Sequence, residues 1–260
     1  MKNLKQILVA IFVLTLISAC EKDENDPKNE ILEKATISAK WTVNNSSDYE
    51  SFEFNESGNY IVVKKPSTKS TNDQVVFFGT YEITDDKTIV LSNFGTLTIT
   101  EIDENSISFS ILLVSNPDSQ VSIKASKAEE LESSTNTDLL CQSWELVSFG
   151  GETMSDFYVL FSSAGTYLVN AEVDGEEITG LGTWTWCNTD ENKLAFTIDN
   201  TLDCDGIEII KDIKLTSESF SGIDMENGEP MEMIMQPASS TKSARLKSQK
   251  NGVMIFGIEK

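Results

Sequence analysis

The chain has 260 residues, of which 39% are hydrophobic and 24% charged, so it can form one large domain or two small ones with real cores. Its 42 acidic residues outnumber 20 basic ones, and the net charge of -22 argues against nucleic-acid binding because a negative surface repels phosphate backbones. The absence of histidine excludes Ser-His-Asp and Cys-His nucleophile pairs, so we predict a non-enzymatic protein without cofactors.

The N-terminus has the features of a secretory signal peptide over residues 1–19. Two lysines precede an apolar run from Ile7 to Ile17, which is shorter than the about 20 residues that a membrane-spanning helix needs. The run ends in Ile17-Ser18-Ala19-Cys20, which resembles the lipobox of bacterial lipoproteins. This resemblance implies that Cys20 is lipidated and becomes the mature N-terminus; an ordinary cleavage site with an incidental cysteine is the alternative.

Residues 20–36 are expected to form an acidic tether, because they contain too few apolar residues to fold. Four acids follow the cysteine closely: Glu21, Asp23, Glu24 and Asp26. The segment resembles the export signal with which some Gram-negative bacteria send lipoproteins to the outer face of the outer membrane. The resemblance implies a lipid anchor in the outer membrane and exposure on the cell surface, and a plain solvated linker is the alternative.

The body of the chain contains an internal repeat. Three motifs return at offsets of 103, 107 and 103 residues: Trp41 as Trp144, Gly58-Asn59-Tyr60 as Gly165-Thr166-Tyr167, and Gly79-Thr80 as Gly182-Thr183. The spacing predicts a duplicated domain, with copies at residues 37–125 and 139–236 and a linker at 126–138.

Each copy alternates apolar and polar residues over short runs that are separated by turn residues, a pattern typical of half-buried strands. We expect eight strands in the first copy, at 39–43, 49–54, 58–64, 75–83, 87–91, 94–102, 105–113 and 120–125. An even-stranded meander can close and bury its edges, so the predicted fold class is all-β, with two tandem antiparallel up-and-down barrels or meanders. A single barrel shared by both copies is the alternative.

The order of these motifs is similar to that of bacterial lipocalin-like domains found in surface lipoproteins. A tryptophan lies near the first strand, a Gly-x-Tyr hairpin follows, then a Gly-Thr-Tyr or Gly-Thr-Trp strand and a last hairpin. The resemblance implies that Trp41 and Trp144 close one end of each barrel. Neither tryptophan lies in the Gly-x-Trp motif of true lipocalins.

Two strands of the second copy carry candidate ligand-binding residues. Trp184 and Trp186 share one strand face, and Met231, Met233 and Met235 share a face of the last strand. Side chains of these types can line an apolar pocket, or they can fill the core of a small barrel. Core packing is the favoured interpretation, because buried aromatic residues dominate the core energetics of small barrels.

Besides Cys20, the chain has Cys141, Cys187 and Cys204, which predicts one disulfide and one free thiol in an oxidising compartment. Strand parity in a meander favours Cys141 with Cys187 at one rim of the barrel. The pairing of Cys187 with Cys204 stays open if the loop at 199–206 folds back. A calcium-loop-like stretch from Thr201 lacks an acidic first ligand, so we predict no metal site.

Residues 237–260 form a basic C-terminal arm that contains Lys242, Arg245, Lys247 and Lys250 and then an apolar run over 253–258. We expect an added strand in that run. The basic part is expected to lie on the acidic second domain or to be a frayed tail.

These features predict a lipoprotein that is anchored in the outer membrane through Cys20 and binds a small apolar or amphipathic ligand, or serves as an accessory to a surface protein complex. The alternative is an adhesion or protein-interaction module with filled barrels and no ligand cavity. A hydrolase that uses only carboxylates is a third class, although no paired-carboxylate motif marks one.

Overall fold

The computed structural model describes residues 32–45, 47–65, 75–173, 175–198, 201–226, 228–239, 244–247 and 254–259. The predicted signal peptide, Cys20 and most of the predicted tether lie outside the described residues. The chain divides into a unit of residues 1–30, which lies outside the described residues, and a unit of residues 31–260, which contains both copies of the repeat. Its described helices are all too short or too polar to span a membrane.

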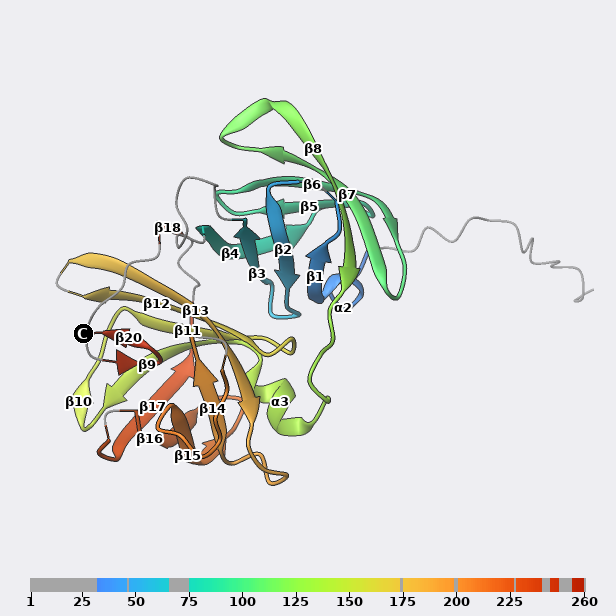
Figure 1. Ribbon diagram of the computed structural model, residues 1–260. Coiled ribbons are helices and arrows are strands. Elements are labelled where there is room, and N and C mark those ends of the chain that lie inside the picture. The colour runs from blue at the N-terminus through green and yellow to red at the C-terminus, as the bar shows by residue number, and fades with distance from the viewer. Residues whose placement is uncertain are drawn as a thin grey trace, which may run out of the picture. The chain divides into compact units, whose positions relative to one another are not determined.

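The first copy forms a closed antiparallel barrel of eight strands (Figure 1). The strands are β1 (Ala39–Val43), β2 (Tyr49–Phe54), β3 (Asn59–Lys64), β4 (Val75–Ile83), β5 (Thr88–Leu91), β6 (Gly95–Ile102), β7 (Ser106–Leu113) and β8 (Asn116–Lys127). Each strand pairs with the next, and β1 pairs with β8 to complete the circle. The predicted eight-stranded meander is therefore confirmed for this copy.

The second copy closes in the same way, through β9 and β17. Its strands are β9 (Ser143–Phe149), β11 (Phe157–Phe161), β12 (Thr166–Val173), β13 (Glu176–Trp186), β14 (Leu194–Thr197), β15 (Ile209–Leu215), β16 (Phe220–Asp224) and β17 (Met231–Pro237), with a short β10 (Glu152–Thr153) beside β9. Two separate barrels are thus present, and the alternative of one shared barrel is wrong.

A short helix precedes each barrel and is joined to it by the first-strand tryptophan. Trp41 Nε1 donates to the carbonyl oxygen of Ile37, the last residue of α2 (Lys34–Ile37), at 2.9 Å. Trp144 Nε1 donates at 2.9 Å to the carbonyl oxygen of Leu140, the last residue of α3 (Thr135–Leu140). Both indole rings are buried, so each tryptophan fastens its helix to the core.

The repeated glycine motifs occupy equivalent turns. Gly58 and Gly165 both adopt positive φ, of 90° and 70°, at the hairpin between the second and third strands of their barrels. Each turn carbonyl accepts a backbone hydrogen bond from the fourth strand, Gly58 from Tyr81 and Gly165 from Trp184. The repeat found in the sequence therefore marks residues that set the turn and its contact with a neighbouring strand.

The two barrels share a small apolar cluster on their outer faces. Its buried side chains come from β3 and β4 of the first barrel and from β11 and β12 of the second: Ile61, Val63, Val76, Phe78, Leu160 and Leu168. Lys40 Nζ also donates to Thr166 Oγ1 at 3.1 Å. This cluster explains why residues 60–63 form an unbroken apolar run, since both faces of β3 are buried there.

The C-terminal arm contacts both barrels. The strand β18 (Ala244–Lys247) pairs with β4 of the first barrel and also contacts β13 of the second, so the part of the basic arm that is described lies on both domains, not on the second alone. Lys242 and Lys250 lie outside the described residues. The expected strand near the end is a hairpin of β19 (Met254–Ile255) and β20 (Ile258–Glu259), and Ile255 and Phe256 belong to the core of the second barrel.

The segments at the domain edges are folded where they are described. Leu32, within the predicted tether, is buried in the first core, and α2 follows it with three of its four residues still inside the predicted tether. The predicted linker at 126–138 includes the end of β8 and the start of α3. Local helix formation before each barrel shortens the connecting segments.

Candidate functional site

Trp184 is part of the second core and does not line an open wall. Its side chain is 1% exposed, and its Nε1 donates to the carbonyl oxygen of Ser162 at 3.0 Å. Its ring meets the ring of Phe161 edge to face, with centroids 5.7 Å apart. The indole is therefore held by packing on its face and by a hydrogen bond at its edge.

The first barrel contains a counterpart of Trp184. Tyr81 occupies the equivalent strand, its hydroxyl donates to the carbonyl oxygen of Asn55 at 2.8 Å, and its ring lies edge to face on Phe54. Asn55 and Ser162 both precede the glycine turn of their barrel. An aromatic side chain that fastens this turn is thus an architectural feature of both copies.

Trp186, the other candidate on the strand, is half-buried and lies edge to face against Trp184. Its Nε1 donates to Thr137 Oγ1 in α3 at 2.9 Å. The contact joins α3 to β13 at the rim of the barrel. The two tryptophans lie together as the sequence predicted, and both have protein partners.

The three candidate methionines occupy one face of β17, as predicted. Met233 and Met235 are fully buried in the second core, whereas Met231 is half-buried and packs over Gly150. A Cβ atom at Gly150 would lie 2.3 Å from Met231 Cε, so the glycine makes room for the thioether. The methionines fill irregular space between β9, β16 and β17.

Both barrel interiors are packed with the protein's own side chains. The fully buried aromatic residues of the first barrel include Trp41, Phe52, Tyr60 and Phe109, with Phe52 and Phe109 edge to face at 5.0 Å. Those of the second include Trp144, Phe161, Tyr167, Trp184, Phe196, Phe220 and Phe256. Together with the aliphatic residues of each core, these rings fill the interior of a small barrel.

The disulfide joins Cys187 to Cys204, with Cα atoms 5.5 Å apart, and Cys141 is the free thiol among the three described cysteines. The pairing of Cys141 with Cys187 that strand parity favoured is wrong. Parity failed because Cys204 does not begin a strand: β15 starts at Ile209, and the preceding loop folds back so that Lys193 Nζ donates to the carbonyl oxygen of Cys204. Burial raises the pKa of the Cys141 thiol at the end of α3.

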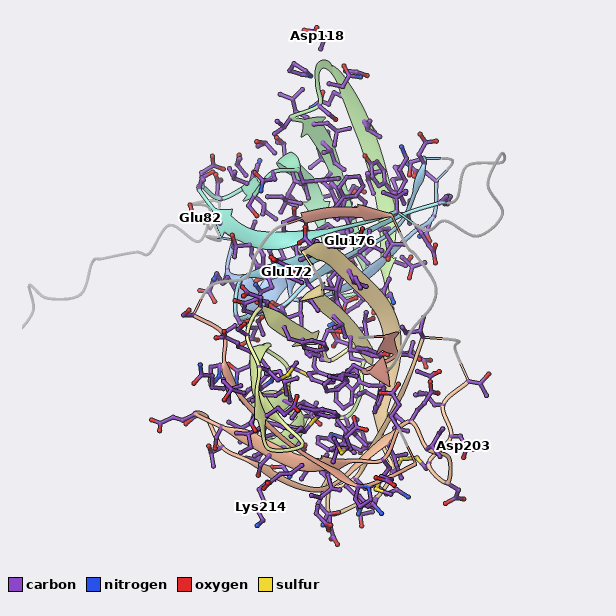
Figure 2. The ribbon with its side chains drawn as sticks, turned by 90° about the vertical axis from the view of Figure 1, so that its left-hand side faces the viewer. Glu82, Asp118, Glu172, Glu176, Asp203 and Lys214 are labelled. Carbon is purple, nitrogen blue, oxygen red and sulfur yellow. A yellow bond between two sulfur atoms is a disulfide. The ribbon has the colours of Figure 1, made fainter. Side chains whose placement is uncertain are left out.

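The calcium-like stretch forms an acidic turn. Asp203 Oδ1 accepts from the backbone N–H of Asp205, and the carbonyl oxygen of Asp203 accepts from the N–H of Gly206. Figure 2 shows Asp203 in the loop beside the disulfide, drawn in yellow. These contacts satisfy the turn through its own side chain.

The sequence reading missed a pair of buried acids at the end of β16. Asp224 is 0% and Glu226 3% exposed, and one oxygen of each carboxyl, Asp224 Oδ2 and Glu226 Oε2, lacks a hydrogen-bond partner among the described residues. Burial raises the pKa of Asp224 to about 7, and burial together with the nearby Asp224 raises that of Glu226 to about 8. The alternation Phe220-x-Gly222-x-Asp224 could have revealed one of them, because it places Asp224 on the inward face of its strand.

An apolar patch lies on the outside of the first barrel, formed by Val90, Leu112 and Val114, which are 40%, 43% and 69% exposed. Val90 pairs with Thr96, and Thr96 with Leu112, so the two apolar residues lie in one cross-strand row over β5 to β7. The Val114 N–H is fixed to the carbonyl oxygen of Phe94. We call these three residues the outer patch; Figure 2 shows Asp118 at the tip of the neighbouring β7–β8 hairpin.

Comparisons with known proteins assign no family to these features. The chain matches no protein-family model, and no curated protein is significantly similar to it in sequence.

Proposed function

We propose that the chain is a non-enzymatic protein-interaction module that the cell displays at its outer-membrane surface through a lipidated Cys20. The observation that carries the proposal is the filling of both barrel interiors by buried aromatic and aliphatic side chains, joined by methionines in the second barrel. A filled interior leaves the outer faces and hairpins as the surfaces for recognition. The predicted small apolar ligand stays a prediction, and the packing favours the alternative of a module without a cavity.

The outer patch is the recognition surface that the proposal favours. Val114 is the most exposed of the large apolar residues in the described chain; Leu112 lies two residues before it, and Val90 lies in the same cross-strand row as Leu112, with Thr96 between them. Exposed apolar residues that gather on one face are typical of protein-protein contact sites. With a net charge of -22 on the chain, the partner is expected to surround an apolar contact with basic residues.

The lipid anchor is supported by the order of the N-terminal motifs. Two lysines, an apolar run and the Ile17-Ser18-Ala19-Cys20 sequence occur in the order of a lipoprotein signal, and an acidic stretch follows. A lipidated N-terminus would hold the barrels at the membrane surface through the segment that precedes Leu32.

Site-specific photo-cross-linking in the cells of origin tests this function. A photoreactive residue at Val114 should give discrete protein adducts, whereas one at Glu218, an exposed position on a turn of the second barrel, should not. Leu112→Asp should reduce the adducts, and Ile234→Asp, a matched change at an exposed residue of the second barrel, should leave them unchanged. Cys20→Ala should release the protein from the membrane fraction.

Two results would contradict the proposal. A small molecule retained by the native protein in mass spectrometry, together with absence of Val114 adducts, would favour the carrier function. Membrane retention of the Cys20→Ala variant would remove the lipid anchor from the proposal.

A further inference from the structure

The last described turn of the chain lies in an aromatic cup of the second barrel. Phe256 is 0% exposed, and its ring centroid lies 5.8 Å from that of Phe161, 6.1 Å from Tyr167 and 5.1 Å from Phe196. The cup residues belong to β11, β12 and β14 of the closed barrel. Phe256 comes from a segment that the barrel does not need for closure, because β9 and β17 already pair.

Two hydrogen bonds recognise the backbone of this turn. The Tyr167 hydroxyl donates to the carbonyl oxygen of Phe256 at 3.2 Å, and the Gly257 N–H donates to Glu226 Oε1 at 2.9 Å. The phenyl ring and the carbonyl oxygen of Phe256 and the N–H of Gly257 thus each contact a matching group of the barrel. Figure 1 shows the dark red β19 and β20 at the second barrel, and β20 contacts β13.

The turn has residue types that are unusual in an ordinary two-residue hairpin loop. They favour the interpretation that the barrel binds the turn as a ligand. Phe256 and Gly257 are its two central residues and have φ of 53° and 77°, a combination for which Asn-Gly is the usual choice. A bulky residue at positive φ is strained, so the contacts of the phenyl ring must offset that cost. Glycine suits the next position because L side chains rarely adopt its φ of 77°, and because a Cβ atom there would lie 2.6 Å from Ile198 Cδ1.

We propose that the aromatic cup and Glu226 form a binding site for an aromatic residue followed by glycine, that the chain fills this site with its own Phe256-Gly257, and that ionisation of Glu226 and Asp224 releases the turn. The proposal stands apart from the outer patch and from the lipid anchor. It assigns the C-terminal segment the role of a tethered ligand.

Ionisation of the buried carboxyls of Glu226 and Asp224 is the event that releases the turn. Glu226 lies just after β16, which ends at Asp224. Burial raises its pKa most, the carboxyls of Asp224 and of Glu208 before β15 raise it further, and the backbone N–H groups of Gly257 and Phe256 lower it. Asp224 Oδ1 in turn accepts from the Glu226 N–H at 2.7 Å. With two acids and no described cation acting on it, Glu226 is held mostly as the neutral acid below its pKa of about 8.

The direction of the pH effect follows from this arrangement. When the turn leaves, Glu226 loses both the burial that raises its pKa and the two N–H groups that lower it. Burial is the larger effect, so the pKa falls toward the ordinary value of 4.5, and the filled site binds a proton that the open site does not. Occupancy is therefore strongest in acid and weakens as the pH rises through about 8. For one carboxyl with this difference, linkage predicts a loss of affinity on the order of 10- to 100-fold between pH 6 and pH 9.

A peptide added in trans tests the site. The full chain with Phe256→Ala should bind a fluorescent peptide of sequence MIFGIEK saturably at pH 6 and about 10- to 100-fold more weakly at pH 9. The wild-type chain should bind it much less, because its site is filled, and a peptide with alanine in place of the phenylalanine should not bind. Adding Glu226→Gln should remove most of the pH dependence, since an amide oxygen still accepts the bond and only Asp224 is left to ionise. The matched change Glu232→Gln, at an exposed acid of β17, should leave it intact.

A fluorine label on Phe256 in the wild-type chain gives a second readout that needs no destabilising change. Its resonance should move from a buried to a solvent-exposed position as the pH rises through about 8. A resonance that stays buried from pH 6 to pH 9, or a folded Phe256→Ala chain that does not bind the peptide, would overturn the proposal.

Discussion

Trp41 and Trp144 make equivalent contacts in the two barrels, but the carbonyl groups that accept their indole hydrogen bonds differ. Both rings are buried and both indoles donate to the last carbonyl of the preceding helix. The acceptors differ, because Leu140 O also receives the N–H of Gln142, whereas the bond to Ile37 O comes from Trp41. Removing the indole donor should therefore cost more in the first barrel than in the second.

We predict that Trp41→Phe lowers the free energy of unfolding by about 2–3 kcal/mol, from lost volume and from a buried carbonyl without its donor. Trp144→Phe should cost about 1 kcal/mol less, because Gln142 still serves Leu140 O. Urea unfolding followed by circular dichroism measures both changes. Trp186→Phe, which removes a half-buried donor to Thr137, is the control and should cost least; equal losses for Trp41 and Trp144 would contradict the prediction.

At the scale of elements, the loop between β14 and β15 is held by the disulfide and not by strand pairing. Cys187 and Cys204 are 17 residues apart. The stretch of chain that the disulfide closes includes β14 and the turn at Asp203. Closing a loop of this length restricts the unfolded chain and contributes about 3 kcal/mol. The loop is thus the element whose order depends most on oxidation.

We predict that the double change Cys187→Ser and Cys204→Ser lowers the free energy of unfolding by about 2–4 kcal/mol. The change Cys141→Ser keeps the disulfide and should cost much less. Denaturant titration and thiol counting in guanidinium measure these effects in a chain that lacks Cys20. In the Cys204→Ser variant both remaining thiols should be free, and a Cys141–Cys187 crosslink in that variant would show that the barrel rim brings them together.

The first barrel also shows what local pattern can and cannot predict. Seven of its strands agree with the expected ranges to within one residue, because alternation and turn residues act locally. The last strand, β8, begins at Asn116 and not at 120, since its exposed polar residues carry no apolar alternation and are held by pairing with β7. The strand face on which Trp184 lies was predictable in the same way. Its hydrogen bond to the carbonyl oxygen of Ser162, which holds the glycine turn, could be seen only in the structure.

At the scale of the whole molecule, contacts between distant segments were beyond the sequence reading. The pairing of β18 with β4 and the burial of Phe256 in the second core join the C-terminus to segments far upstream. Nothing in the local pattern of a basic arm names its partner strand, because backbone hydrogen bonds are the same for every sequence. The apolar run at 60–63 did carry a signal, since a strand that faces solvent on one side alternates and this one does not.

The chain divided between residues 128 and 129 tests how far each barrel is independent. Segments 32–128 and 129–260 should each give a β-type spectrum and a cooperative melt, because each closes its own eight strands. The first segment loses its pairing with β18, and both expose the apolar cluster of Ile61 and Leu168, so the halves should associate when mixed.

The apolar cluster that contains Ile61 and Leu168 should control this association of the two segments. Ile61→Ser in the first segment should weaken it, because a hydroxyl would be buried against Leu160 and Leu168, while Thr98→Ser, at an exposed position of β6 outside the cluster, should not. Analytical ultracentrifugation measures the change. If the halves fold yet stay apart, the cluster contributes little beyond the covalent connection; if neither folds, the barrels form one cooperative unit, and the duplicated sequence encodes two cores that need each other's outer face.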